Sequence, residues 1–263
     1  MIRVFRAEWR KLRRPTLFYG TLVAVMGVTA LVTSLLFLLI DSENGNSREG
    51  QTINRAILSS FKGITIGFSG SAGLLGLVAL CVFASQTAQE YTYGTLRNLL
   101  VRQPRRLTLL AGKFISMTLF SLISVFLSAA VSIGLAFALA GRAKVSSDAW
   151  TTSDARTALV HTFINVFLSV IAFGAIGMIL GLLLRSPISA ISIGVAWLIV
   201  IETIVSAVVK SSAKWMPGQL INSVAAGGDF NASYTHALAM LSGYLIFGIA
   251  LVAVLFRRRD VSN

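Results

Sequence analysis

Six long apolar runs decide what this chain can fold into. Each run holds about 20 residues or more, the length at which an α-helix crosses roughly 30 Å of hydrocarbon. Only 13% of the 263 residues are charged, about half the share that covers a soluble domain. A water-soluble fold is therefore excluded, and we expect an all-α integral membrane protein whose single domain spans residues 1–263. The predicted membrane spans are residues 17–40, 63–85, 110–140, 160–184, 188–209 and 235–256.

The basic residues predict how the spans are oriented. The chain has 23 lysines and arginines against 10 acidic residues, a net charge of +13. When the spans alternate across a membrane, most of the basic residues and nearly all of this net charge fall on the side that holds both termini. Translocation disfavours cations in short exported loops, so both termini are expected in the cytoplasm. Because the cations form short clusters between apolar runs, no nucleic-acid partner is expected.

The first 15 residues predict an amphipathic helix. Ile2, Phe5, Trp9 and Leu12 recur at helical spacing, and arginine and lysine fill most of the remaining positions. Such a helix lies in the membrane interface, in contact with lipid, until Pro15 breaks it. A basic flank that only enforces orientation is the simpler alternative.

The loop over residues 86–108 is too patterned for a plain connector. Leu96, Leu99 and Leu100 share one face of a short helix, Glu90 and Arg97 lie two turns apart, and a proline follows at position 104. This pattern predicts a helix along the membrane surface that presents apolar side chains to a cytoplasmic partner. Periodicity alone favours the simpler interpretation, a positively charged loop with one interfacial helix.

The same segment carries a family resemblance. Glu90-Tyr91-x-x-Gly94-Thr95-Leu96-Arg97, followed by Pro104-Arg105-Arg106 and Gly112-Lys113, resembles the permease subunits of ABC-2 type transporters. The six spans, the cytoplasmic termini and the amphipathic entry helix match as well. The resemblance implies a permease in a bacterial or archaeal inner membrane that exports a drug, antibiotic or peptide-like amphiphile. It also implies a dimer, formed with a second copy or a related subunit.

The resemblance further implies that separate ABC ATPase subunits drive the permease. In this family the loop after span two forms a coupling helix that contacts the ATPase. The sequence has no Gly-x-x-x-x-Gly-Lys-Ser/Thr phosphate loop, so we expect ATP and Mg²⁺ on the partner, no cofactor on this chain and no enzymatic activity of its own. The residues implied in the ATPase contact are Glu90, Tyr91, Gly94, Thr95, Leu96 and Arg97.

A carboxylate and an amide inside the spans need partners. Glu202 lies about 21 Å into span five at 1.5 Å per residue, where an isolated acid costs about 2.5–3.5 kcal/mol to insert. It therefore faces a translocation path or bonds to another helix, and both interpretations stay open. Asn165 in span four raises the same question at a lower cost. The motifs Gly63-x-x-x-Gly67 and Gly177-x-x-x-Gly181 indicate close helix packing, which we expect within one subunit.

Other functions have less support in the sequence. Gly67-Phe-Ser69-Gly70 in span two, with His161 and His236 near the starts of spans four and six, resembles fragments of a rhomboid-type intramembrane serine protease. In that family the His-x-x-x-Asn motif precedes the serine, whereas here it follows. The lone cysteine and the missing His-Glu-x-x-His motif give no basis for a metal site, so neither a catalytic nor a metal site is expected. A stand-alone channel, and a complex that transmits ATPase motion without moving a solute, remain alternatives.

Overall fold

The computed structural model describes residues 2–40, 47–48, 51–52, 54–95, 99, 101, 106–230 and 232–258. Within these residues the regular secondary structure is helical apart from one antiparallel pair of two-residue strands, β1 (Ser47–Arg48) and β2 (Gln51–Thr52). The α-helices are α1 (Ile2–Leu12), α2 (Pro15–Leu38), α3 (Arg55–Ser59), α4 (Gly63–Thr92), α6 (Arg106–Ala140), α7 (Ser153–Leu184), α8 (Pro187–Val195), α9 (Glu202–Val208), α10 (Pro217–Ala226) and α11 (Tyr234–Arg258). The structure also contains the 3-10 helices η1 (Asp148–Thr151) and η3 (Lys210–Lys214) and the π-helix η2 (Ala196–Ile201).

Six of the described helices are long and apolar enough to cross a membrane, which confirms the six predicted spans. Span five consists of α8, η2 and α9 in succession. The boundaries differ most where a helix carries polar residues past its apolar part: α4 continues to Thr92 and α7 begins at Ser153. Pro15 and Pro187 occupy the first turns of spans one and five, where the missing N–H breaks no helical hydrogen bond.

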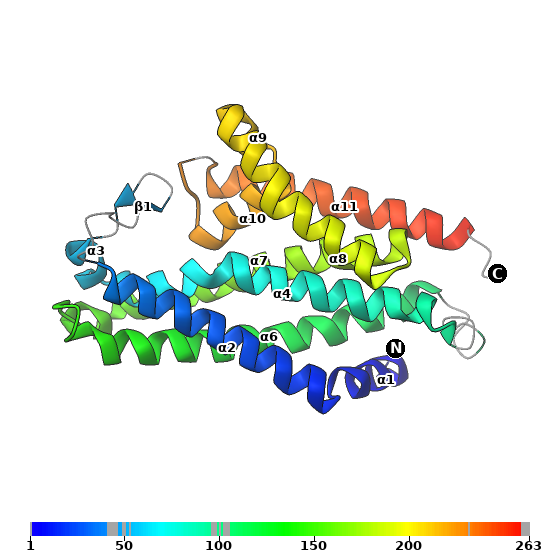
Figure 1. Ribbon diagram of the computed structural model, residues 1–263, viewed down its shortest axis with the longest axis horizontal. Helices are drawn as coiled ribbons and strands as arrows, with labels where there is room; N and C mark the ends of the chain where they lie inside the picture. The colour runs from blue at the N-terminus through cyan, green and yellow to red at the C-terminus, as the bar shows by residue number, and fades with distance from the viewer. Residues whose placement is uncertain are drawn as a thin grey trace.

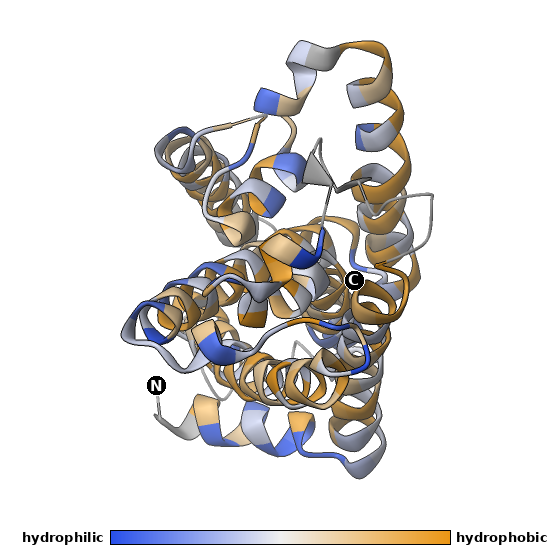
Figure 2. Cartoon of the chain, turned by 90° about the vertical axis from the view of Figure 1, so that its left-hand side faces the viewer, coloured by the Kyte–Doolittle hydropathy of each residue, from blue (hydrophilic) through white to orange (hydrophobic). Residues whose placement is uncertain are grey.

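The long helices form a bundle with one divergent span. The helices α2, α4, α6 and α7 run alongside one another, whereas span five leaves the bundle obliquely and ends in α9 at the top of the view (Figure 1). Figure 2 shows the long helices nearly end-on and α1 crosswise to them. The bundle therefore has two distinct ends, and α1 lies at the end where spans two and three are connected.

Spans two and four pack at backbone distance because of glycines in span four. A Cβ atom on Gly177 would collide with the carbonyl group of Leu80, and one on Gly181 would lie 2.8 Å from the carbonyl oxygen of Ala84. Close approach of this kind stabilises helix pairs in lipid, where the hydrophobic effect does not drive association. The structure thus confirms that these glycines serve packing within the chain.

Spans one and three are joined by buried hydroxyl groups. The Thr29 Oγ1 and Ser128 Oγ atoms lie 2.6 Å apart, and one turn further on Thr33 Oγ1 and Ser132 Oγ lie 3.0 Å apart. All four side chains are buried. Interhelical hydroxyl bonds of this kind contribute about 0.6 kcal/mol each in membrane proteins, so the two pairs add modestly to the packing of α2 against α6.

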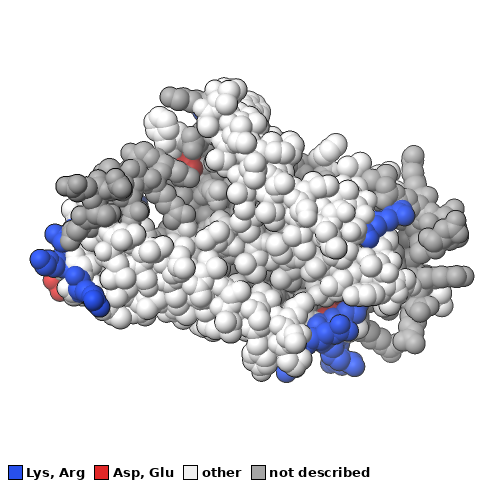
Figure 3. Space-filling view, viewed as in Figure 1, with Lys and Arg blue, Asp and Glu red and all other residues white. Residues whose placement is uncertain are grey.

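The surface has the pattern of a multi-pass membrane protein. Large apolar side chains point outward along the spans, as Val23, Phe126, Ile204 and Phe247 illustrate. On the face drawn in Figure 3, charged side chains gather toward the two ends and leave a broad uncharged region between them. A band of this kind is what hydrocarbon requires.

Candidate functional site

Four charged side chains from three helices meet at the end of the bundle where α4 ends and α6 begins. Lys11 Nζ of α1 lies 2.7 Å from both Glu8 Oε1 and Glu90 Oε1. Lys113 Nζ of α6 lies 3.0 Å from Glu8 Oε2 and 2.8 Å from Glu90 Oε1, and it donates a further hydrogen bond of 3.0 Å to the carbonyl oxygen of Gln86. We call Glu8, Lys11, Glu90 and Lys113 the ion-pair cluster.

The ion-pair cluster is largely shielded from solvent. Lys113 is 1% exposed, Glu8 4% and Glu90 6%, and a buried charge is tolerated only when it is paired and hydrogen-bonded. Burial by itself would raise the pKa of the Glu8 carboxyl, but Lys113 and Lys11 outweigh it and hold that pKa below its ordinary value. Burial would likewise lower the pKa of Lys11, but Glu90 and Glu8 outweigh it and raise that pKa. Glu8 and Lys11 are therefore charged at neutral pH.

The sequence of α1 explains why this helix docks here. Val4, Glu8 and Leu12 recur every four residues, so they share one face, and all three are buried. Gly112 lets this face come close, because a Cβ atom there would lie 2.7 Å from the Val4 side chain. The main chain of α1 contributes as well, because the Phe5 carbonyl oxygen accepts a hydrogen bond of 3.3 Å from the Ser116 hydroxyl of α6.

Of the predicted interfacial residues, Leu12 belongs to this docked face, and Phe5 and Trp9 lie beside it. Leu12 is buried, whereas Phe5 and Trp9 are half-buried and stack on each other with ring centroids 6.3 Å apart. The sequence did not single out Glu8, and Lys113 stood out only as part of the family motif, with no partner assigned to it. A signal was present, because Glu8 is the one acid among six cations in the first 14 residues, but nothing local indicated its distant partner.

The residues implied in an ATPase contact fall into two groups, some packed against the bundle and some exposed beyond it. Glu90 points into the ion-pair cluster, and Tyr91 is half-buried with the Arg185 guanidinium 5.6 Å from its ring centroid. Gly94, which has a φ of 63°, and Thr95 are exposed just beyond α4. Leu96 and Arg97 lie outside the described residues.

Glu202 is fully buried and caps the N-terminus of α10. Its Oε1 accepts a hydrogen bond of 3.0 Å from the N–H of Gly218, and its Oε2 accepts one of 3.1 Å from the N–H of Gln219. These donors have no partner within their own helix. The π-helix η2 sets the direction of this side chain, since the Glu202 N–H bonds to the carbonyl of Trp197 five residues earlier.

The helix α10 packs among the spans instead of outside them. Leu220, Ile221 and Val224 are fully buried in a cluster with Leu80 of α4 and side chains of α7 and α11. The Ser169 hydroxyl of α7 donates to the Ile221 carbonyl at 3.2 Å. Glu202 therefore bonds to another helix, which is one of the two interpretations that the sequence left open.

Asn165 also has a partner from another helix. Its Oδ1 accepts a hydrogen bond of 2.9 Å from the Tyr234 hydroxyl at the start of α11. This contact joins span four to span six beside α10. The Glu202 carboxylate and the Asn165 carbonyl oxygen therefore both have hydrogen-bond partners on other helices.

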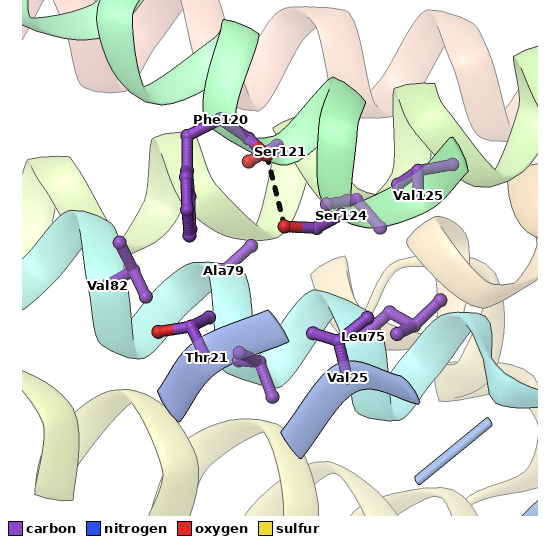
Figure 4. Close-up of a pocket in the computed structure, with 11 residues that line it drawn as sticks. Thr21, Val25, Leu75, Ala79, Val82, Phe120, Ser121, Ser124 and Val125 are labelled. Atoms are coloured by element: carbon purple, nitrogen blue, oxygen red, sulfur yellow. Dashed lines mark hydrogen bonds between the residues drawn. The ribbon is translucent and has the colours of Figure 1, made fainter. Parts of the chain in front are cut away.

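Two cavities accompany these sites. A space of about 10 Å³ between α2, α4, α6 and α7, just large enough for one water molecule, is lined by apolar side chains and the hydroxyls of Thr21, Ser121 and Ser124 (Figure 4). Ser124 donates to the Phe120 carbonyl at 3.0 Å. A larger groove of about 290 Å³ lies between α7, span five and α11, with Trp197 and Pro217 in its almost wholly apolar lining.

The protease pattern is not assembled in the described part of the chain. The Ser69 hydroxyl donates to the carbonyl of Ile66, and His236 Nε2 lies 3.1 Å from the carbonyl oxygen of Lys214. No serine–histidine hydrogen bond joins Ser69 to His161 or His236 among these residues. The described residues likewise contain no group of histidine, cysteine and acidic side chains that could hold a metal ion.

Comparison with known proteins gives one family. A search of curated proteins finds no match. The family model described as "Protein of unknown function (DUF2705)" matches residues 60–262, a stretch that includes Glu90, Lys113 and Glu202 and begins after α2. The chain therefore belongs to the DUF2705 family.

Proposed function

We propose that this chain is the permease subunit of an ABC-2 type exporter in the inner membrane of a bacterium or archaeon. It lines the translocation path together with a second copy or a related subunit. Separate ATPase subunits hold ATP and Mg²⁺ and supply the energy, so this chain catalyses no reaction itself. The substrate is a drug, an antibiotic or a peptide-like amphiphile.

The observation that carries the proposal is the ion pair between Glu90 and Lys113. Both residues belong to the segment on which the resemblance rests, and they lie 23 positions apart in sequence but 2.8 Å apart in space. The pair closes the base of the connection between α4 and α6, and Glu8 ties that base to α1. A loop anchored in this way moves together with three helices, as a coupling element must.

The exposed part of the connection is the contact surface in this proposal. Gly94 and Thr95 lie open to solvent beyond α4, and Leu96 and Arg97 follow them in sequence. Glu90 and Tyr91 then serve to position the connection and do not themselves contact the ATPase. The basic residues at this end favour a cytoplasmic location by the positive-inside rule, which is where an ATPase works.

The region around α10 contributes to the path in this proposal. Glu202 and Asn165 hold α10 and the start of α11 among the spans, where α10 closes the exterior half of the route. The apolar groove beside Pro217 favours an amphiphilic over an ionic substrate.

Cross-linking from the contact surface tests the proposal. With Cys81→Ala as background, which removes the single cysteine of the chain, we would place one cysteine by Thr95→Cys. A tagged full-length protein is then cross-linked in its native membrane and its adducts are identified by mass spectrometry. We expect an adduct with a protein that carries a phosphate loop, and ATP hydrolysis by the purified complex.

The matched control is Thr151→Cys, an exposed site in η1 at the opposite end of the bundle. This cysteine should give no ATPase adduct. The proposal fails if no phosphate-loop protein is cross-linked at position 95 or co-purifies with the chain.

A further inference from the structure

The helix α1 has a second face that the ion-pair cluster does not use. Arg6 and Arg10 of α1 and Arg13 and Arg14 directly after it are all exposed, and Figure 3 shows basic side chains gathered over this part of the molecule. We call these four residues the arginine face of α1. The only acid of α1, Glu8, is turned inward to Lys11 and Lys113. Among the described residues no acidic side chain pairs with any of these four arginines, so all the charge on the outer face of α1 is positive.

The position of α1 indicates what covers this face. Span one begins at Pro15, and the Arg13 N–H still bonds to the Trp9 carbonyl, so only a tight turn separates α1 from the membrane. At 1.5 Å per residue α1 is about 16 Å long, and it lies crosswise to the spans (Figure 2). A helix that leaves a span this abruptly and lies crosswise to it stays at the level of the lipid headgroups.

The side chains between the two faces suit that level too. Phe5 and Trp9 are half-buried and stacked, and aromatic side chains are enriched where hydrocarbon meets headgroups. The outer face therefore combines cations with an aromatic border. This combination is typical of helices that bind anionic membrane surfaces.

We propose that the arginine face of α1 binds the phosphate groups of anionic phospholipids. The opposite face carries Glu8, whose ion pair with Lys113 connects α1 to the ends of α4 and α6. Lipid bound to the arginines holds α1 in place, and through Glu8 it sets the position of the connection after α4. The binding step requires only that the spans lie in a bilayer and does not depend on an ATPase partner.

A local fluorescence experiment tests the binding step. Full-length protein with Cys81→Ala and Ala7→Cys, an exposed position on α1, is labelled and reconstituted in phosphatidylcholine vesicles. Headgroup-spin-labelled phosphatidylglycerol or phosphatidylcholine is then added as the quencher. We expect stronger quenching by phosphatidylglycerol, and the difference should shrink as salt is raised, because exposed charges are screened.

Charge variants make the result specific to α1. Each arginine near an anionic surface contributes about fivefold in affinity, so Arg6→Gln, Arg10→Gln and Arg13→Gln together should abolish the preference for phosphatidylglycerol at position 7. The matched control replaces three exposed cations at the other end by glutamine and should leave that preference intact. The control residues are Arg142, Lys144 and Arg156.

A label introduced by Thr95→Cys tests the second step. With Cys81→Ala as the only other change, replacing phosphatidylcholine by phosphatidylglycerol should shift the emission of this label. Glu8→Gln should abolish that shift while preserving the preference for phosphatidylglycerol at position 7. Equal quenching by both lipids at position 7 overturns the proposal. The arginine face would then be expected to bind an acidic protein surface instead of lipid. A lipid preference without any response at Thr95 overturns the transmission step.

Discussion

Lys113 is the residue on which the ion-pair cluster depends. Its ammonium group contacts Glu8, Glu90 and the carbonyl oxygen of Gln86, and these three acceptors use all of its donors. It is also the most deeply buried of the four charges. Lys11 also contacts both carboxylates, but it is partly exposed. It therefore cannot by itself compensate the two carboxylates when the positive charge of Lys113 is removed.

Lys113→Met should therefore destabilise the protein by about 3–5 kcal/mol, the usual cost of leaving a buried charge without its partner. Adding Glu90→Gln should restore part of this loss, since it removes one of the uncompensated carboxylates. Thermal unfolding in a fixed detergent measures both effects. Lys144→Met, at an exposed position, is the control, and an equal effect of the two methionine variants would contradict the role assigned to Lys113.

The pH dependence of stability follows from Glu8 and Lys11. The pKa of Glu8 is lowered from about 4.5, so its contribution declines as the pH falls below 4.5 and is gone below its folded-state pKa. The pKa of Lys11 is raised from about 10.5, so its contribution declines only above that pH. Between these limits the contribution of these two groups to the unfolding temperature should stay constant. Glu8→Gln should lower that plateau and flatten the acid limb, and an unchanged acid limb would show that other groups govern it.

At the scale of elements, α10 is held by its two ends. Glu202 satisfies the first free N–H groups of the helix, and Gly218 makes this possible, because a Cβ atom there would lie 2.7 Å from Glu202 Oε2. The left-handed Gly227 ends the helix with a φ of 79°. A short helix with an apolar body and both ends bonded can remain among membrane spans without exposing its backbone to lipid.

Glu202→Ala should loosen α10, because it leaves two buried N–H groups without an acceptor. Glu202→Gln keeps one acceptor oxygen and should recover much of the loss. Hydrogen exchange of the α10 amides is the measurement, and exchange should accelerate in the alanine variant. Thr203→Ala changes the exposed neighbouring side chain and serves as the control. Slow α10 exchange in the alanine variant would rule out the capping role.

The pairing of α4 with α7 gives a second prediction for an element. Gly177→Ala places a methyl group on the Leu80 carbonyl, so the two helices must separate and the unfolding temperature should drop by several degrees. Gly134→Ala in α6 is a matched control, because a Cβ atom there meets nothing within 4 Å. That change should be neutral or stabilising, since alanine favours a helix over glycine by about 1 kcal/mol. The same drop in both variants would mean that contact with Leu80 is unimportant.

At the scale of the whole molecule, the spans were predictable and the contacts between them were not. Hydrophobic length alone locates a span, since every backbone group in hydrocarbon must bond within its helix. The sequence predicted that Glu202 needs a partner, because inserting a carboxylate into a membrane span costs free energy whichever way the side chain is directed. The identity of that partner, α10, depends on the π-helical turn before Glu202, and the pairing of Glu8 with Lys113 depends on how α1 docks. Neither leaves a periodic signal in the sequence.

The orientation of the whole molecule yields the final prediction. If the basic end is cytoplasmic, a cysteine introduced by Thr95→Cys should react with a membrane-impermeant maleimide only after cells are permeabilised, whereas Thr151→Cys should react in intact cells. Both sites are exposed at opposite ends of the bundle, and Cys81→Ala removes the native thiol as background. The opposite pattern would put Thr95 outside the cell, beyond the reach of a cytoplasmic ATPase. Since the exporter proposal needs Thr95 inside, this single pair of labels tests the orientation before any partner is sought.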